Sequence, residues 1–389
     1  ARELVNASGV YPTKAVAVVR AKGAHLWDAD GKRYIDCSAG HGVACLGHAH
    51  PRWVQAVSTQ AGTLTTLASS FPNDQRAEFQ ERLIDFLPDG FDRLFFCNSG
   101  TEAVEAALKF ARRSTGRTGI VAAQRGFHGR TMGALSCTWE KKYREPFMPL
   151  VAAVQHAPYG NLEKFAELVN ENTACVIVEV VQGEGGVRPA QAEFLTGLRA
   201  LCDEHGTLLV FDEVQTGFGR TGRRFAFEHF GVTPDLLALG KAIAGGIPMG
   251  AVALGMCVNK MSMGDHGSTF GGNPLACAAG NATLKTLVDD KLVERSAELG
   301  DWFRSELDRI EDPQLREVRG MGLMVAMDFR CRVAPILERL QAAGVVALPA
   351  GPTVLRFLPP FVIEKEDLAH VVTTVREVLE SLSIEGATR

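Results

Sequence analysis

Residues 208–222 read LLVFDEVQTGFGRTG, and this stretch decides the fold. Four apolar residues run into Asp212, and a segment with three glycines follows. A short apolar run with such a boundary is typical of a buried strand. In an open parallel sheet, ligands bind beyond the carboxyl ends of the strands, so an acid here either caps the next segment or faces a ligand. The glycines favour a loop that approaches a ligand over a capped helix.

The same pattern recurs along the chain. Apolar runs at 94–97, 120–123 and 175–178 are bounded by Gly, Asn or acidic residues. Amphipathic stretches such as 101–113 and 193–205 lie between the runs. Alternating strands and helices, with strands that are apolar almost throughout, predict an α/β fold with a mostly parallel central sheet covered by helices on both faces.

The texture of the sequence changes after about residue 289. Charged amphipathic helices expected at 291–311 and 365–382 accompany short strands expected near 323–329 and 354–357. Strands are also expected at residues 16–19 and 25–27, in a segment that the pattern alone places with either domain. We predict three parts: an N-terminal segment (1–45) that packs with the small domain, a large domain (46–288) and a small α+β domain (289–389).

The composition excludes several classes of protein. The 389 residues carry 41 Lys+Arg against 45 Asp+Glu, a net charge of −4, which argues against nucleic acid as a partner. No apolar run reaches the ~18 residues that a membrane span needs. The nine cysteines are scattered without a C-x-x-C pair, so neither disulfides nor a metal site is expected. Cysteines of this kind predict a reducing, cytoplasmic compartment.

Lys241 stands out because no other charged residue occurs between Asp235 and Lys260. A lysine among apolar and small residues is either buried, where desolvation makes its neutral, nucleophilic amine accessible, or extends its ammonium to solvent from a helix end. A Walker phosphate loop is excluded, because Ala242 follows where Ser or Thr is required and Asp235 replaces the first glycine.

A candidate phosphate site lies at residues 98–102, NSGTE, between a predicted strand and an alanine-rich helix. Small hydroxyl residues and a glycine at such a junction bring backbone N–H groups and the positive helix end to one point, although plain helix capping gives the same pattern. A strand-end acid, an isolated lysine and this helix start together describe a pocket for pyridoxal 5′-phosphate.

Six motifs then carry a resemblance that runs from about Gly9 to Glu380. They are NSGTEA (98–103), GFHGRT (126–131), QGEGG (182–186), DEVQTG (212–217), Lys241 and STFGGNP (268–274). With these motifs the sequence resembles the class-III aminotransferases of the fold-type I pyridoxal-phosphate enzymes, within the acetylornithine aminotransferase family. It is most similar to the branch that makes lysine on the carrier protein LysW. One departure is Val180, where the family commonly has proline after Glu179.

The resemblance implies a role for each cofactor residue. Lys241 would hold the cofactor covalently and carry a proton, and Asp212 would pair with the ring nitrogen. Phe127 and Val214 would lie on the two faces of the ring, and Gln215 would reach its hydroxyl. His128 is left outside the catalytic pair of Lys241 and Asp212. The implied cofactor-binding set is Ser99, Gly100, Thr101, Phe127, Asp212, Glu213, Val214, Gln215, Lys241 and Thr269.

The resemblance also implies how substrates bind. Arg130 would clamp a substrate carboxylate. Glu184 would cover Arg356 while the ω-amino donor reacts, then swing away so that Arg356 takes the α-carboxylate of glutamate. Thr269 and Ser268 would come from the partner subunit of a homodimer.

The expected reaction is transfer of the terminal amine of an N-acylated diamino acid, carrier-bound lysine or N2-acetylornithine, to 2-oxoglutarate. Alternatives are a 4-aminobutyrate- or ornithine-type aminotransferase, an aminomutase, and a non-catalytic dimer that retains the cofactor. If the acidic carrier docks, a basic rim is expected, with Arg220, Arg223 and Arg224 as candidates by composition.

Overall fold

A seven-stranded sheet forms the centre of the computed structural model, which describes residues 6–11, 13–14, 16–259 and 261–387. All neighbouring pairs are parallel except those made by β12, which runs antiparallel to both of its neighbours. The strands expected at 94–97, 120–123, 175–178 and 208–211 are confirmed. In spatial order the strands are β4 (Phe91–Cys97), β12 (Gly250–Gly255), β11 (Leu236–Leu239), β10 (Leu208–Asp212), β7 (Thr173–Val178), β5 (Gly119–Ala123) and β6 (Val154–Ala157).

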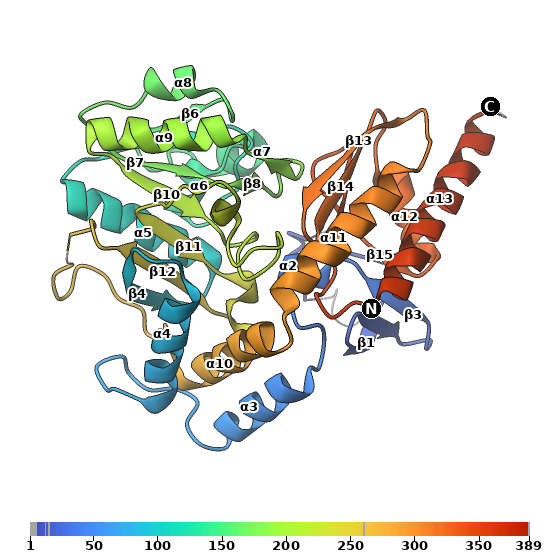
Figure 1. Cartoon of the computed structure of the whole chain (residues 1–389), viewed down its shortest axis with the longest axis horizontal. Helices are drawn as coiled ribbons and strands as arrows, with labels where there is room; N and C mark the ends of the chain where they lie inside the picture. The colour runs from blue at the N-terminus through green and yellow to red at the C-terminus, as the bar shows by residue number, and fades with distance from the viewer. Residues whose placement is uncertain (1–5, 12, 15, 260, 388–389) are drawn as a thin grey trace.

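Both faces of the five inner strands are buried, which explains why these strands are apolar almost throughout. Within β10, Val210 packs in one core cluster with helix α5 (Gly100–Thr115). Its neighbours Leu209 and Phe211 pack in the other cluster, with helix α9 (Ala192–His205). Helices therefore cover the sheet from opposite sides, as Figure 1 shows on the left of the view.

A second, antiparallel sheet lies to the right in Figure 1, against three helices. Its order is β13 (Leu315–Met321), β14 (Met324–Phe329), β17 (Val354–Phe357) and β16 (Leu348–Pro349). The helices are α11 (Leu292–Asp308), α12 (Ala334–Ala342) and α13 (Lys365–Ala387).

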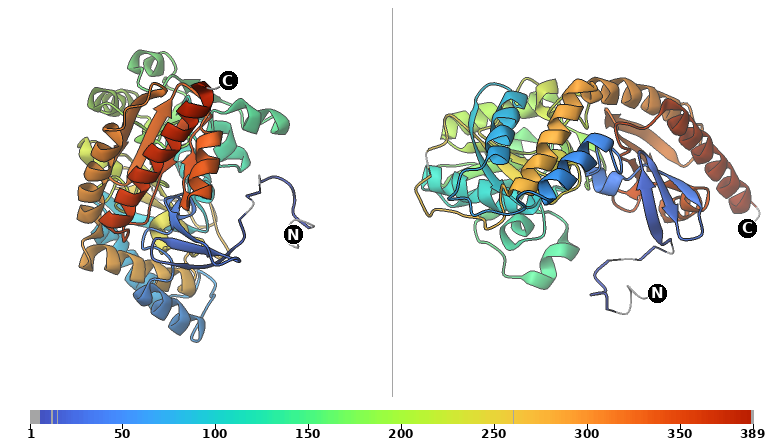
Figure 2. Two further views of the ribbon diagram at one scale, coloured as in Figure 1. Left: turned by 90° about the vertical axis from the view of Figure 1, so that its right-hand side faces the viewer. Right: turned by 90° about the horizontal axis from the view of Figure 1, so that it is seen from below.

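The N-terminal strands join this C-terminal part of the chain. Strands β1 (Val18–Lys22), β2 (His25–Asp28) and β3 (Arg33–Asp36) form a sheet with β15 (Val345–Val346). His25 also contacts Asp367 of α13 at 3.1 Å, and Figure 2 places the blue strands beside the red helix. The proposed boundaries at 45/46 and 288/289 stay predictions, and residues 1–5, 12 and 15 of the first part lie outside the described residues.

The remaining helices and short strands surround the two sheets. Helix α10 packs on α3 and α4. None of the helices that the structure describes is long and apolar enough to cross a bilayer. The bounds are α2 (Ala39–Gly42), α3 (Pro51–Ala61), α4 (Asp74–Phe86), α6 (Met132–Cys137), α7 (Lys141–Arg144), α8 (Leu162–Ala166), α10 (Pro274–Asp289), β8 (Val181–Gln182), β9 (Arg188–Pro189), and the 3₁₀ turns η1 (Glu145–Phe147), η2 (Ala226–His229) and η3 (Lys241–Ala244).

The carboxyl edge of the central sheet gathers the predicted site. Strands β4, β5, β7, β10 and β11 run in one direction, so their carboxyl ends meet at this edge. The ends of these strands and the segments that follow them carry residues 99–101, 127–130, 179–184, 212–215 and Lys241, respectively. This is where an open α/β sheet binds its ligands.

Candidate active site

Lys241 lies two residues after the end of β11 and opens the turn η3 in a left-handed conformation, with φ of +45°. A non-glycine residue adopts this conformation at a cost, and such strain persists where the surroundings hold it, often at functional sites. Burial lowers the pKa of the Lys241 amine to about 8, against the opposing charge of Glu184. A larger share of the amine is therefore neutral and nucleophilic near neutral pH than for an ordinary lysine.

Asp212 ends β10 as a buried carboxylate held at both oxygens. Its Oδ1 accepts the Val214 N–H at 3.0 Å, and its Oδ2 lies 2.8 Å from Nδ1 of His128. Burial disfavours the charged ring, but the hydrogen bond and charge of Asp212 outweigh it and raise the pKa of His128. A protonated His128 stabilises the negative charge of Asp212, which is the state that a ring nitrogen needs opposite it.

Glu179, beyond the end of β7, is a second buried acid beside this pair. Its carboxylate accepts the N–H groups of Phe127 and Gly183, each at 2.9 Å, and so joins the loops that follow β5 and β7. Burial raises the pKa of Glu179 to about 7. The two backbone bonds fix the loop that carries Phe127 without the proline that the family commonly has at position 180.

The start of α5 forms the predicted phosphate end. The Ser99 side chain caps the helix by accepting the Glu102 N–H at 3.3 Å. A Cβ on Gly100 would lie 2.5 Å from Cγ1 of Val214, so only glycine fits at this point. Thr101 accepts the backbone N–H of Arg130 at 3.2 Å, which ties the helix start to the loop after β5.

Phe127 and Val214 are both only partly buried, as side chains that line a ligand pocket should be. The Phe127 ring meets Tyr143 edge-on, with 6.2 Å between ring centroids. Val214 packs against Gly100 and Gly240. Their placement on opposite faces of a cofactor ring stays a prediction.

Arg356 and Glu184 form an ion pair, with 2.7 Å between Nη2 and Oε1. The Arg356 side chain is fully buried, whereas that of Glu184 is 37% exposed. Although burial favours the neutral acid, Arg356 holds the pKa of Glu184 below its usual value. Arg356 also donates to Oε1 of Gln215 at 3.1 Å, and its Nε has no partner within the described part of the chain. Glu184 can thus leave toward solvent while Arg356 stays in place.

Three other predicted residues lie at the periphery. Arg130 is exposed, and its guanidinium carbon lies 3.7 Å from the centroid of the Tyr143 ring. The Ser268 hydroxyl accepts from Nδ2 of Asn98 in the same chain at 3.1 Å, and Thr269 is exposed. Whether Ser268 and Thr269 serve a partner's site stays a prediction.

Glu213 uses its carboxylate within its own loop. It accepts the hydroxyl of Thr216 and the N–H of Phe227, and burial raises its pKa to about 7. Successive residues of a strand face opposite sides of a sheet, so Asp212 and Glu213 are directed apart. The structure therefore gives Glu213 a part in shaping the loop.

Arg220 is not a rim residue, so this expectation was wrong. Its side chain is fully buried and donates to the carbonyls of Leu323 and Pro359 at 2.9 and 2.6 Å. Burial lowers the pKa of Arg220 to about 10. Arg223 and Arg224 are exposed, and Arg224 contacts the aromatic ring of Phe86 at the end of α4.

His128 and Glu179 are the site residues that sequence reasoning missed. His128 lies inside the motif GFHGRT, but nothing in the sequence links it to Asp212, which is 84 positions away. Its Nε2 atom is buried and has no partner among the residues that the structure describes. The signal for Glu179 was its place at the end of an apolar run, the same signal that marked Asp212.

These residues fit pyridoxal phosphate. The group needs an amine to hold its aldehyde carbon, a carboxylate for its ring nitrogen and a helix start for its phosphate. Lys241, Asp212 and the Gly100–Thr101 turn offer these three at one edge of the sheet. Fold and site together define a fold-type I pyridoxal-phosphate enzyme.

The chain belongs to the class-III aminotransferase family, whose model matches residues 6–379. The [LysW]-aminoadipate semialdehyde transaminase of Deinococcus radiodurans is 50% identical over 380 residues, covering 97% of this chain and 89% of that protein. The acetylornithine aminotransferase of Methanosarcina acetivorans is 45% identical over 368 residues, with 94% and 92% covered.

Solved structures agree with this assignment. The crystal structure of ornithine aminotransferase from Toxoplasma gondii matches with a TM-score of 0.94 at 33% identity, covering 99% of this chain and 94% of that chain. The predicted family, fold, cofactor and enzyme class are confirmed: the chain is a pyridoxal-phosphate-dependent aminotransferase.

Proposed function

We propose that this aminotransferase moves the terminal amino group of an N-acylated diamino acid to 2-oxoglutarate, reversibly, in lysine and/or arginine biosynthesis. Relatives that act on LysW-linked semialdehydes and relatives named for acetylornithine, at 44 to 50% identity, support both donors. We favour the LysW-linked donor, because the Deinococcus radiodurans relative, at 50% identity, is named for it. A cytoplasmic homodimer is part of the proposal.

The ion pair of Glu184 with buried Arg356 carries the proposal. A 2-oxo diacid and glutamate each bring an α-carboxylate that needs a guanidinium, whereas the ω-amino donor presents its reacting carbon without a carboxylate beside it. A covered arginine suits the ω-amino donor, and an uncovered one suits glutamate. One movable carboxylate thereby lets a single pocket serve both halves of the exchange.

The chain's own residues divide the work. Pyridoxal phosphate, when bound, supplies the carbonyl that takes up the amino group and the ring that delocalises electrons. The Lys241 amine carries the proton away from the carbon that bears the amino group, since its pKa of about 8 allows it to act as a base. Asp212, backed by His128, keeps its negative charge toward the ring nitrogen. Arg130 orients a substrate carboxylate.

Steady-state kinetics with two donors tests the substrate. We expect a higher kcat/KM for lysine joined to LysW than for free N2-acetylornithine, each with 2-oxoglutarate. A much higher kcat/KM for free acetylornithine would overturn the preference for the carrier.

Product analysis separates the alternatives. Turnover without 2-oxoglutarate would indicate an aminomutase, and preference for 4-aminobutyrate or unacylated ornithine would indicate the other ω-aminotransferases. A protein that binds the cofactor without turning over any of these donors would be a non-catalytic dimer.

A further inference from the structure

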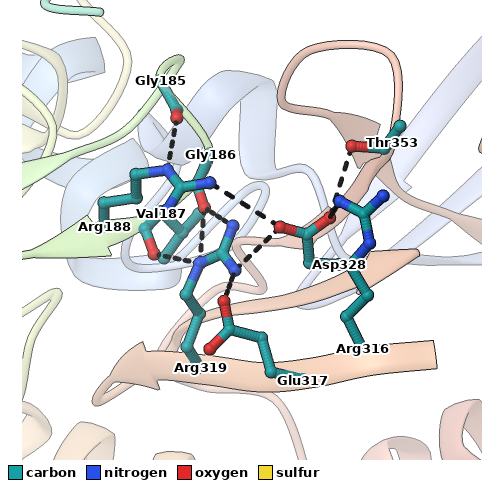
Figure 3. A network of polar contacts seen from close by, with 9 residues as sticks. All are labelled: Gly185, Gly186, Val187, Arg188, Arg316, Glu317, Arg319, Asp328 and Thr353. Atoms are coloured by element: carbon teal, nitrogen blue, oxygen red, sulfur yellow. Dashed lines mark hydrogen bonds and ion pairs between the residues drawn. The ribbon is translucent and has the colours of Figure 1, made fainter. Parts of the chain in front are cut away.

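A polar network joins the loop that follows Glu184 to the small sheet (Figure 3). At its centre Arg319 of β13 donates through Nε to the carbonyls of Gly186 and Val187, at 2.9 and 3.0 Å. Its Nη2 donates again to the Gly186 carbonyl at 2.6 Å. The side chain is nearly buried, with 11% exposed, so these bonds are shielded from water.

The other end of the guanidinium is anchored in the sheet. Nη1 of Arg319 donates to Oδ2 of Asp328 on β14 at 3.0 Å and also contacts Glu317. Asp328 is buried, and its second oxygen accepts the hydroxyl of Thr353 at 3.3 Å. The Arg319 guanidinium is therefore held by the small sheet, and through it the sheet sets the position of the loop that follows Glu184.

Register places Arg319 and Arg356 in one row. Arg319 pairs with Ala326 across β13 and β14, and Ala326 pairs with Arg356 across β14 and β17. Directly opposed residues of an antiparallel sheet project to the same face. Two arginines of one row thus hold one loop: Arg356 holds the side chain of Glu184, and Arg319 holds the backbone two and three residues further on.

The loop backbone needs such a restraint. Val187 is fully buried with φ of +50°, and Gly186 has φ of +112°. A β-branched residue in the left-handed region is strained, and the strain persists only where surrounding contacts over-determine it. The carbonyls that Arg319 binds belong to these two residues.

We propose that Arg319 is a positioning residue that sets how tightly Glu184 covers Arg356, and thereby how well the enzyme distinguishes its ω-amino donor from glutamate. The inference rests on the proposed function. Without Arg319 the loop relaxes, and Glu184 covers Arg356 less often. Exposed Arg356 then captures the donor's carboxylate in an unproductive orientation, whereas glutamate, which needs Arg356 uncovered, is little affected.

The test compares the two half-reactions of the holoenzyme by single-turnover absorbance, with the ω-amino donor that the wild type converts (lysine joined to LysW or N2-acetylornithine) and with glutamate. In Arg319→Ala, kcat/KM for this ω-amino donor should fall roughly tenfold while the glutamate value stays within about twofold. Arg319→Lys keeps a charge beside Asp328, but one ammonium cannot replace every hydrogen bond of the guanidinium. The ratio of kcat/KM for the ω-amino donor to kcat/KM for glutamate should therefore fall roughly threefold in this variant. This milder variant decides the matter if Arg319→Ala does not fold.

Arg316→Ala is the matched control, because Arg316 reaches the same Asp328 at 3.8 Å from an exposed position. Its ratio of half-reactions should equal that of the wild type. If Arg319→Ala and Arg319→Lys slow both half-reactions equally, or slow neither, the ratio of the two kcat/KM values is unchanged. That result overturns the inference about Arg319 but leaves the proposed function standing. A wild type that converts glutamate but no ω-amino donor overturns the proposed function, and the inference with it.

Discussion

The chemistry of the Lys241 amine depends on its surroundings. With a pKa of about 8, its neutral fraction rises roughly tenfold between pH 7 and pH 9 and then levels off. An ordinary lysine, with a pKa near ~10.5, would gain about tenfold for each pH unit throughout that range. The difference follows from burial, which disfavours the charged form.

We therefore predict the pH dependence of cofactor uptake. The initial rate of covalent attachment of pyridoxal phosphate to cofactor-free protein should rise about tenfold from pH 7 to pH 9 and then reach a plateau. Absorbance at a series of pH values measures it, and Lys241→Ala should attach none. A rate that still climbs about tenfold per unit above pH 9 would contradict the lowered pKa.

At the scale of single residues, the sequence predicts a site residue when the residues next to it in the chain mark it as unusual. Lys241 is predictable because its surroundings are apolar, and Asp212 because it ends an apolar run. The bond of Asp212 to His128 is not predictable, since it depends on which strands lie side by side. The prediction for Arg220 was wrong because a charged residue is usually at the surface, whereas this guanidinium is buried and donates to two backbone carbonyls.

Among the elements, α11 packs unusually closely on the turn between β13 and β14. A Cβ on Gly300 would lie 2.1 Å from the carbonyl carbon and oxygen of Gly322. Alanine is worth up to ~1 kcal/mol over glycine in a helix, but overpacking costs ~1–3 kcal/mol. The cost of the close contact should exceed the gain in helix propensity, so alanine at position 300 should destabilise the fold.

Gly300→Ala should therefore lower the thermal midpoint of unfolding by several degrees, measured by circular dichroism on the holoenzyme. Gly267→Ala is the control, because no described atom lies within 4 Å of its added Cβ and its φ is not in the left-handed region. Equal midpoints for the two variants would show that the helix can move away from the turn.

Element types follow from hydrophobic pattern more readily than strand direction does. Helix 365–382 and strand 354–357 were predicted from periodicity, and α13 and β17 confirm them. The reversed direction of β12 was not, because an apolar run buried on both faces reads the same in either direction.

For the whole molecule, the proposed homodimer places Thr269 in the partner subunit's site. Phe270, which adjoins Thr269, is an exposed large apolar residue, as are Met263 and Phe71.

A complementation experiment tests the shared site. Lys241→Ala and Thr269→Glu should each be inactive, the second because its carboxylate repels the phosphate. Coexpressed, they should recover about a quarter of wild-type activity, since about half of the dimers are mixed and each has one intact site of two. Activity no higher than that of Thr269→Glu alone would place Thr269 in its own chain's site.

Long-range assembly is the part that sequence predicts least. Strand β3 pairs with β15, more than 300 residues later, and two-residue strands such as β15 carry no periodicity. The register that aligns Arg319 with Arg356 likewise exists only once three strands have paired.

The pair of Glu184 and Arg356 has a consequence for metabolism. If, as proposed, the Glu184 carboxylate alternates between covering and uncovering Arg356, every donor and every acceptor would use the same pocket in turn. Two biosynthetic routes that relied on this protein would compete for it. The flux into each would follow the relative concentrations of their intermediates, and a surplus in one route would slow the other without any dedicated regulatory site.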